Sequence, residues 1–118
     1  MEHLKRRQDF VAAARALSAV TPGMVVQVRN RLDEAAPRVG FTCSKKIGNA
    51  VMRNRAKRRM REIIRLNLGP EARTGHDYVL IGRLATAKRS FDDLQKDLSS
   101  ALKRLHRTPR EVADKGKS

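Results

Sequence analysis

Apolar residues recur along this chain with two different periods, and the period of each segment predicts its secondary structure. Alternation of apolar and polar residues, as in Val26 and Val28 against Gln27, is typical of a strand with one buried face. Apolar residues that return every three or four positions, as at Leu94 and Leu98, are typical of a helix with a buried stripe. These patterns predict helices at 9–19, 50–68 and 90–107 and strands at 24–31, 39–44 and 77–82.

Breaking and capping residues mark the ends of the predicted helices. The Pro-Gly pair at 22–23 follows the first helix, and the second helix stops at the Gly-Pro pair at 69–70, where the glycine is expected to form a C-cap. Ser90, with Asp93 three positions later, can cap the start of the last helix. The chain is therefore expected to contain three main helices.

The order of these elements predicts an α+β domain in which a sheet carries helices on at least one face. The strands at 24–31 and 39–44 are expected to pair directly, joined through 32–38. With 118 residues and 40% apolar residues, the chain can bury the core of one domain, placed at 1–107. Apolar periodicity is lost afterwards, so 108–118 is predicted to be a disordered basic tail.

The charge of the chain is its most unusual property. It contains 27 Lys and Arg residues against 12 Asp and Glu residues, a formal net charge of +15. Nine of the cations fall at 44–65, where Glu62 is the only acid. Runs of alternating sign usually form a solvated face, but the signs here do not alternate. A polyanion, and nucleic acid first of all, is therefore the expected partner.

On a helix that begins at Ala50, the charged and apolar residues of this segment separate onto two faces. Arginine predominates over lysine, which suits bidentate contacts with phosphates and stacking on bases. The apolar face carries Met52, Ala56, Met60 and Ile63, and the opposite face carries Asn54, Lys57, Arg58, Arg61 and Arg65.

The sequence contains no group of residues suited to catalysis or to metal binding. His3, His76 and His106 are scattered, and none has the spacing of a metal ligand to another histidine, cysteine or carboxylate, so they are expected to be surface or hydrogen-bonded histidines. Cys43 is the only cysteine, which excludes an intramolecular disulfide and indicates a small core residue. No catalytic residue and no metal ligand is predicted.

No apolar run approaches the ~18–20 residues of a membrane span, and charges near the N-terminus interrupt any signal-peptide core. A basic amphipathic helix can also lie on an anionic membrane, but this one lacks Trp and Phe on its apolar face. The expected location is the cytoplasm, away from membranes.

Several segments resemble one protein family closely. The segment SKKIGNAVMRNRAKRRMRE at 44–62 has an Arg-Asn-Arg triplet within a basic helix, and the agreement extends to LKRRQDF at 4–10, RVGFTCSKK at 38–46, HDYVLIGR at 76–83 and SFDDLQKDL at 90–98. On these motifs, which cover most of the chain in the family order, it resembles the protein subunit of bacterial ribonuclease P.

The resemblance implies both a fold and a function. The fold is a single-domain α/β sandwich of the α+β class, with a mixed four-stranded sheet, about three helices and a left-handed β-α-β crossover, like the second domain of ribosomal protein S5. The function is that of a subunit of the ribonucleoprotein endoribonuclease that removes the 5′ leader of precursor tRNA. The implied partners are the catalytic RNA and precursor tRNA, with Mg²⁺ held mainly by the RNA and no obligate protein partner.

The same resemblance assigns the residues that contact RNA. In the family, the basic helix faces the catalytic RNA, and the leader lies in a cleft between the sheet and the N-terminal helix. Carried over, the leader cleft involves Phe10, Val26 and Phe41. Ala14 and Gln27 stand where family members often carry aromatic residues, so stacking on the leader is expected to be weak. The residues expected to bind RNA are Lys45, Lys46, Arg53, Asn54, Arg55, Lys57, Arg58, Arg61 and Arg65.

Two other classes of protein share the charge and the basic helix. A ribosomal or other structural RNA-binding protein would bind RNA without increasing the cleavage of precursor tRNA. A DNA-binding helix-turn-helix module needs two adjacent helices joined by a short turn, whereas strands are predicted to flank the basic helix here. Competition between duplex DNA and structured RNA separates these classes.

Overall fold

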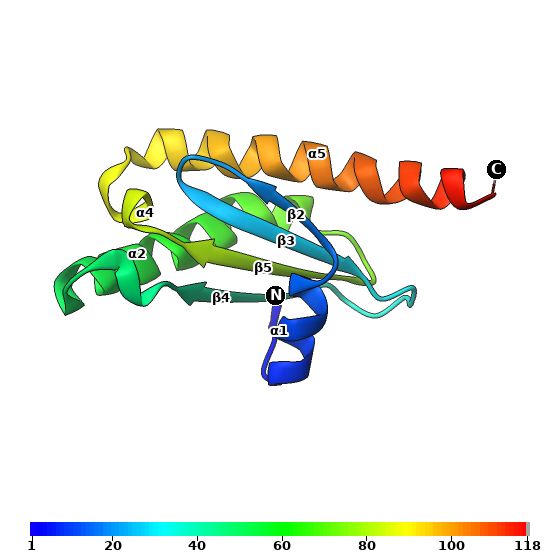
Figure 1. Cartoon of the computed structure of the whole chain (residues 1–118), viewed down its shortest axis with the longest axis horizontal. Coiled ribbons are helices and arrows are strands. Elements are labelled where there is room, and N and C mark those ends of the chain that lie inside the picture. Colours follow the sequence, from blue (N-terminus) through cyan, green and yellow to red (C-terminus); the bar gives the residue numbers. More distant parts are fainter. Residues whose placement is uncertain (118) are drawn as a thin grey trace.

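A five-stranded mixed sheet forms the centre of the protein (Figure 1). The computed structural model describes the backbone of residues 1–117 and the side chains of 1–44 and 46–106. The strands lie in the order β1-β4-β5-β3-β2 across the sheet. Their bounds are β1 Glu2–His3, β2 Leu17–Val20, β3 Met24–Asn30, β4 Arg38–Cys43 and β5 His76–Gly82. The predicted α+β class is confirmed, with five strands in place of four.

Strand β5 is the central strand, and the predicted direct pairing of β3 with β4 is wrong. Residue Leu80 of β5 lies between Phe41 of β4, which runs parallel to it, and Val26 of β3, which runs antiparallel. The alternation within a strand shows which face is buried, but not which strand lies beside it. Continuous burial from Tyr78 to Leu80 is the property that indicates a central strand. The left-handed sense of the β4–α2–β5 crossover stays a prediction.

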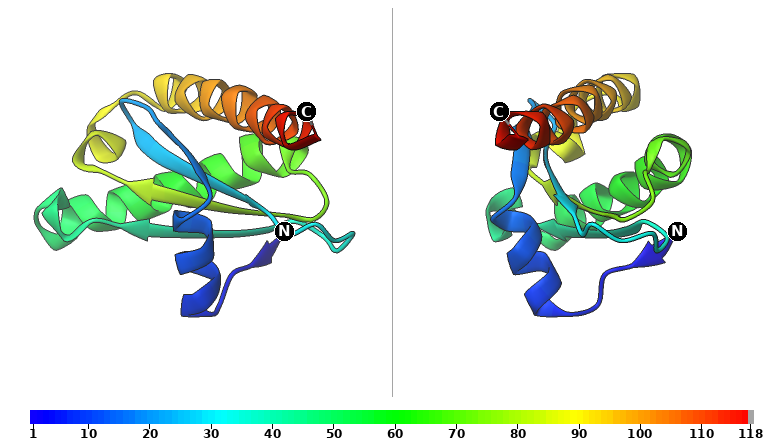
Figure 2. Two further views of the ribbon diagram at one scale, coloured as in Figure 1. Left: turned by 45° about the vertical axis from the view of Figure 1, so that its right-hand side comes forward. Right: turned by 90° about the vertical axis from the view of Figure 1, so that its right-hand side faces the viewer.

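Helices cover both faces of the sheet (Figure 2). Helices α2 (Ala50–Ile63) and α5 (Phe91–Lys117) lie on one face, and α1 (Arg7–Ala14) lies on the other. The larger core, under α2 and α5, contains Val26, Val39, Met60, Leu80 and Leu98. The smaller core, under α1, contains Leu4, Ala13 and Val79, with Phe10 and Ile81 packed against it.

The first predicted helix, at 9–19, is wrong over its second half. Helix α1 ends at Ala14, and Leu17–Val20 form β2, which pairs antiparallel with β3. A tight connection follows, in which the Thr21 hydroxyl donates to the Met24 carbonyl at 2.7 Å and accepts from the Met24 N–H at 3.1 Å. Leu17 fits either period, so pairing with β3 outweighs the weak preference of this segment for a helix.

The long basic helix does not end at a left-handed glycine cap as predicted. Helix α2 continues through a π-helical turn (Ile64–Leu68) into the short helix α3 (Gly69–Glu71). Gly69 has φ −49° and ψ −52°, which is helical, and its N–H bonds to the Ile64 carbonyl five residues earlier. The ring of a proline clashes with the N–H and the Cβ of the residue before it, so a glycine before Pro70, which has no Cβ, reduces this clash within the helix.

Helix α5 begins where the sequence predicts. The Ser90 hydroxyl accepts a hydrogen bond from the Asp93 N–H at 3.1 Å, and the predicted apolar stripe is buried, as at Leu94. The helix reaches Lys117, and Ser118 lies outside the described residues. The expected disorder of 108–118 stays a prediction. The short helix α4 (Leu84–Lys88) was not predicted, because five residues carry too little periodicity to detect.

A cluster of ion pairs lies on the α1 face of the sheet. Asp77 is fully buried and accepts two hydrogen bonds from the Arg38 guanidinium, each 2.8 Å long, and another from Arg31. Arg29 lies 3.6 Å from the same carboxylate. Burial opposes ionisation of Asp77, but the hydrogen bonds from Arg38 and Arg31 outweigh it, so its pKa lies below the usual range. Asp77 thus holds β3, β4 and β5 together electrostatically.

Gly40 of β4 leaves room for the ring of Phe10 from α1. A Cβ at position 40 would lie 2.6 Å from two ring carbons of Phe10. We expect Gly40→Ala to displace the ring and to lower the free energy of unfolding by about 1–3 kcal/mol, measured by urea denaturation. In a Phe10→Ala background the same substitution should cost much less, and an equal cost in both backgrounds would show that the ring is not the obstacle.

Candidate nucleic-acid interface

Polar side chains cap the 3-10 turn at Lys45–Ile47 and the start of helix α2, which follows it. The Ser44 hydroxyl accepts a hydrogen bond from the Lys46 N–H at 3.1 Å, and the Asn49 side-chain oxygen accepts one from the Met52 N–H at 2.9 Å. Such bonds satisfy backbone donors that a helix start leaves free. Gly48 lies between them with φ 116°, a conformation that residues with a Cβ rarely adopt. This segment therefore sets the direction of α2 relative to β4.

Helix α2 buries its apolar face, as the sequence predicts. Ala56, Met60 and Ile63 are fully buried against the sheet and its neighbours. The opposite face is exposed, and its exposure leaves the cations available to a partner. Of the residues predicted to bind RNA, Lys46, Asn54, Arg55, Lys57, Arg58, Arg61 and Arg65 are exposed, Arg53 is half-buried, and the side chain of Lys45 lies outside the described residues.

Arg53, Lys57 and Arg61 form a row on the side of α2 that faces β4, called the basic row below. Burial raises the pKa of the Cys43 thiol in β4, and the positive charges of Lys57, Arg53 and Arg61 oppose that rise without cancelling it. The Arg61 guanidinium lies over the ring of Phe41, 5.7 Å from its centre, within the range of a cation–π interaction. Within the described part of the chain, no carboxylate forms an ion pair with the basic row.

Two other arginines of this segment have partners within the protein. Arg59 donates to the backbone carbonyls of Thr86, at 3.3 Å, and Arg89, and so links α2 to α4. Burial, helped by neighbouring arginines, lowers its pKa. Arg65 forms an ion pair with Glu62 one turn earlier, which offsets part of its charge. The structural role of Arg59 was not predicted. The sequence feature that could have indicated it is the position of Arg59, one residue before buried Met60.

The three residues predicted for the leader cleft are not brought together by the fold. Phe10 lies on the α1 face of the sheet, whereas Phe41 packs against the larger core on the α2 face. Val26 is fully buried in that core, so its assignment to a binding cleft is wrong. The alternation of apolar and polar residues in β3 could have indicated this burial, because Val26 lies on the same face of the strand as Val28. The same alternation places Gln27 on the α1 face.

The histidines occupy positions typical of structural residues. Burial, above all, lowers the pKa of His106 to about 4, and its neutral ring forms a 2.7 Å hydrogen bond with the Tyr78 hydroxyl. His76 Nδ1 lies 2.9 Å from the Thr74 carbonyl oxygen, and His3 is exposed. In the residues that the structure describes, no group of three or more His, Cys, Asp and Glu side chains could hold a metal ion. None of the described helices is long and apolar enough to span a membrane.

Comparison with known families identifies one that matches nearly the whole chain. Residues 1–106 match the model of the family described as Ribonuclease P. The ribonuclease P protein component of Ruegeria pomeroyi is 57% identical over 106 residues, covering 87% of this chain and 85% of that protein. The ribonuclease P protein component of Caulobacter vibrioides is 48% identical over 102 residues, covering 86% of this chain and 68% of that protein.

Solved structures show the same fold. The RNase P protein of Staphylococcus aureus superposes with a TM-score of 0.72 at 27% identity, over 89% of this chain and 95% of that one. The RNase P protein of Thermotoga maritima superposes with a TM-score of 0.70 at 30% identity, over 88% of this chain and 97% of that one.

Proposed function

This chain belongs to the ribonuclease P protein family, and we propose that its basic row on α2 binds the catalytic RNA of that ribonucleoprotein. It is the protein component of an endoribonuclease that processes the 5′ ends of tRNA. The observation that carries the proposal is a row of cations, two exposed and one half-buried, that has no ion-pairing carboxylate among the described residues and lies on a helix that buries Ala56, Met60 and Ile63 in the core. Phosphates of an RNA would neutralise this row.

The proposal extends to the other residues of the exposed face. Arg58 and Arg55 are exposed farther around α2 from the Arg53–Arg61 row, and the amide of exposed Asn54 can bond to sugar or base edges. Lys46 and Lys45 precede the helix and add charge at its start. Arg65 contributes less, because Glu62 already pairs with it. A ribosomal or other structural RNA-binding role is not favoured, because the family match covers residues 1–106.

Precursor tRNA is the proposed second RNA, with its 5′ leader on the α1 face of the sheet. Phe10 on α1 and Gln27 on β3 lie on that face, apart from the basic row. This separation would let the protein contact both RNAs and reduce the repulsion between their phosphates. The expectation of weak stacking, from Ala14 and Gln27, stays a prediction.

Mg²⁺, which the family implies, is proposed to be held mainly by the partner RNA. The described residues contain no cluster of three or more His, Cys, Asp and Glu side chains, and a net charge of +15 disfavours a divalent cation on the protein alone, which supports the proposal. The protein's part is to bind and position RNA.

The test is the cleavage of a 5′-extended precursor tRNA by the cognate catalytic RNA at low Mg²⁺, with and without this protein. We expect the protein to raise kcat/KM clearly. If it neutralises about 6–10 phosphates, its affinity for the RNA should fall by about 10³–10⁵ between 50 and 200 mM salt. RNA binding without any rise in kcat/KM would instead support a structural RNA-binding protein.

A further inference from the structure

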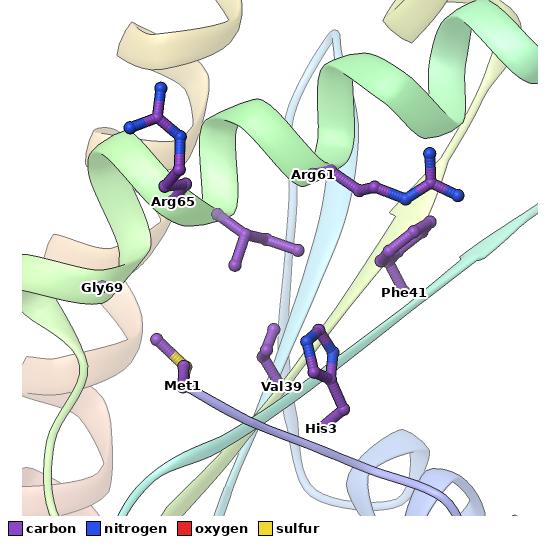
Figure 3. Close-up of a pocket in the computed structure, with 8 residues that line it drawn as sticks. Met1, His3, Val39, Phe41, Arg61, Arg65 and Gly69 are labelled. Carbon is purple, nitrogen blue, oxygen red and sulfur yellow. The ribbon is translucent and has the colours of Figure 1, made fainter.

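A cavity of about 330 Å³ opens between the N-terminal strand, β4 and the end of α2 (Figure 3). Its volume falls within the range of small-ligand sites, about 300–1,000 Å³. Figure 3 shows His3 and Met1 pointing toward α2 from the N-terminal strand, and Arg61 extending from α2 to lie over Phe41. Arg65 points away from the space that these side chains enclose.

The lining of the cavity combines an apolar floor, one aromatic ring and a cationic rim. Val39 is fully buried, Ile64 nearly so, and the half-buried ring of Phe41 forms part of the wall. Arg61 and His3 supply polar groups at the rim, and the lining residues include no carboxylate. A flat aromatic group joined to an anion is complementary to this lining, and a nucleotide has both parts.

The position of the cavity indicates which RNA would supply that nucleotide. The cavity lies at the end of the basic row, because Arg61 lines the cavity and is also the last residue of the row. It also lies on the α2 face of the sheet, whereas Phe10 and α1 lie on the opposite face. An RNA strand that follows the basic row would therefore reach the cavity without crossing the sheet.

The local backbone leaves the cavity open. Strand β1 pairs with only Arg38 and Val39, so beyond Val39 the outer edge of β4 has no strand partner among the described residues. The π-helical turn at 64–68 lies beside the cavity, and such turns are frequent at functional sites. Gly69 lies at the mouth of the cavity and has no side chain to narrow it. A Cβ at this position would lie 3.7 Å from its nearest neighbour, the Ile64 carbonyl oxygen.

We propose that this cavity receives an unpaired base of the catalytic RNA, stacked on Phe41, while Arg61 holds the adjoining phosphate. The inference rests on the proposed function, and it adds a base contact to a surface that otherwise recognises phosphates. Stacking of a base on an aromatic side chain contributes independently of salt, whereas phosphate contacts weaken as salt rises.

The first experiment measures the Kd of the catalytic RNA for four proteins at two salt concentrations. The proteins are the wild type, Phe41→Leu, which removes the ring, Phe41→Tyr, which keeps it, and Phe91→Leu. Phe91, like Phe41, is half-buried against the larger core. Phe91→Leu is therefore the matched control, because it also removes an aromatic ring that packs on that core. Urea denaturation checks the stability of each variant.

We expect Phe41→Leu to weaken binding by about 5-fold to 100-fold at both salt concentrations, with the salt dependence unchanged. Phe41→Tyr and Phe91→Leu should bind as the wild type does. Unchanged affinity for Phe41→Leu would overturn the proposal. A loss of affinity together with a shallower salt dependence would also overturn it, because Phe41 would then act only by positioning Arg61.

A second experiment identifies the source of the base and does not depend on removing Phe41. A benzophenone amino acid replaces exposed His3 at the rim, and the crosslinks formed in the holoenzyme with precursor tRNA are mapped. Crosslinks to an unpaired nucleotide of the catalytic RNA support the proposal, whereas crosslinks only to the leader, or to base-paired RNA, overturn it. Failure of the wild type to stimulate cleavage would count against the proposed function, not against the cavity alone.

Discussion

Reversing the charge of Arg53, Lys57 and Arg61 to glutamate is expected to abolish the stimulation of precursor-tRNA cleavage while leaving the fold intact. Each hydrogen bond to a charged phosphate contributes about 1.5–3 kcal/mol, so losing three should weaken RNA binding by well over 100-fold. The slope of log affinity against log salt should also fall by about 3, one for each lost phosphate contact. Both are measured by titrating the catalytic RNA at several salt concentrations.

The fold should survive because Lys57 and Arg61 are exposed, Arg53 is half-buried, and none pairs with a carboxylate among the described residues. Circular dichroism and urea denaturation check this. A second triple variant, Lys88, Lys96 and Lys103 to glutamate on α4 and α5, changes the net charge equally at exposed positions away from the basic row. If both variants lose binding to the same degree, net charge and not the basic row governs recognition. A folded basic-row variant that still stimulates cleavage would contradict the proposed function.

Replacing Asp77 with alanine is expected to lower the free energy of unfolding by about 3 kcal/mol, because Arg31 and Arg38 lose their buried hydrogen-bond acceptor and keep, among the described residues, only the more exposed carboxylates of Asp33 and Asp9 as counter-charges. Arg31 and Arg38 both donate to this fully buried carboxylate, and Arg29 lies 3.6 Å away. Urea denaturation measures the loss. Asp33→Ala is the control, because Asp33 pairs with the same Arg31 from an exposed position and its removal should cost much less.

The stabilisation by Asp77 should depend on pH in a defined direction. Because its pKa is lower in the folded protein, the stabilisation is complete above about pH 4, where an unfolded aspartate is ionised as well. It is lost as the pH falls through the folded pKa. The difference in stability between the wild type and Asp77→Asn should therefore narrow as the pH is lowered below about 4. A difference that does not change with pH would show that ionised Asp77 does not stabilise the fold.

The sequence predicted the elements whose pattern is long and local. Helix α2 and its two faces follow from the spacing of Met60 and its neighbours, and the start of α5 follows from Ser90. The cations exposed on α2 could be identified for the same reason, because the angle between residues on one helix depends only on their spacing. The assignment of these cations to RNA came from charge and from the resemblance to a family.

The short or ambiguous segments could not be predicted in the same way. Leu17 fits a helix and a strand equally well, and only pairing with β3 decides between them. Gly69 before Pro70 reads as the end of a helix, yet the π-helical turn carries the chain through. In both places the contacts that decide the structure come from residues distant in the sequence or from a rare backbone geometry.

By itself, the sequence determined that this chain is a basic α+β protein with one amphipathic, arginine-rich helix, because periodicity and charge are local properties. Only the tertiary structure decided that β5 separates β3 from β4 and that Arg59 donates to the backbone carbonyls of Thr86 and Arg89. It also decided that Phe41 lies under Arg61 beside a cavity, whereas Phe10 lies on the opposite face. These outcomes depend on which strands and helices become neighbours, and the spacing of residues within an element does not contain that information.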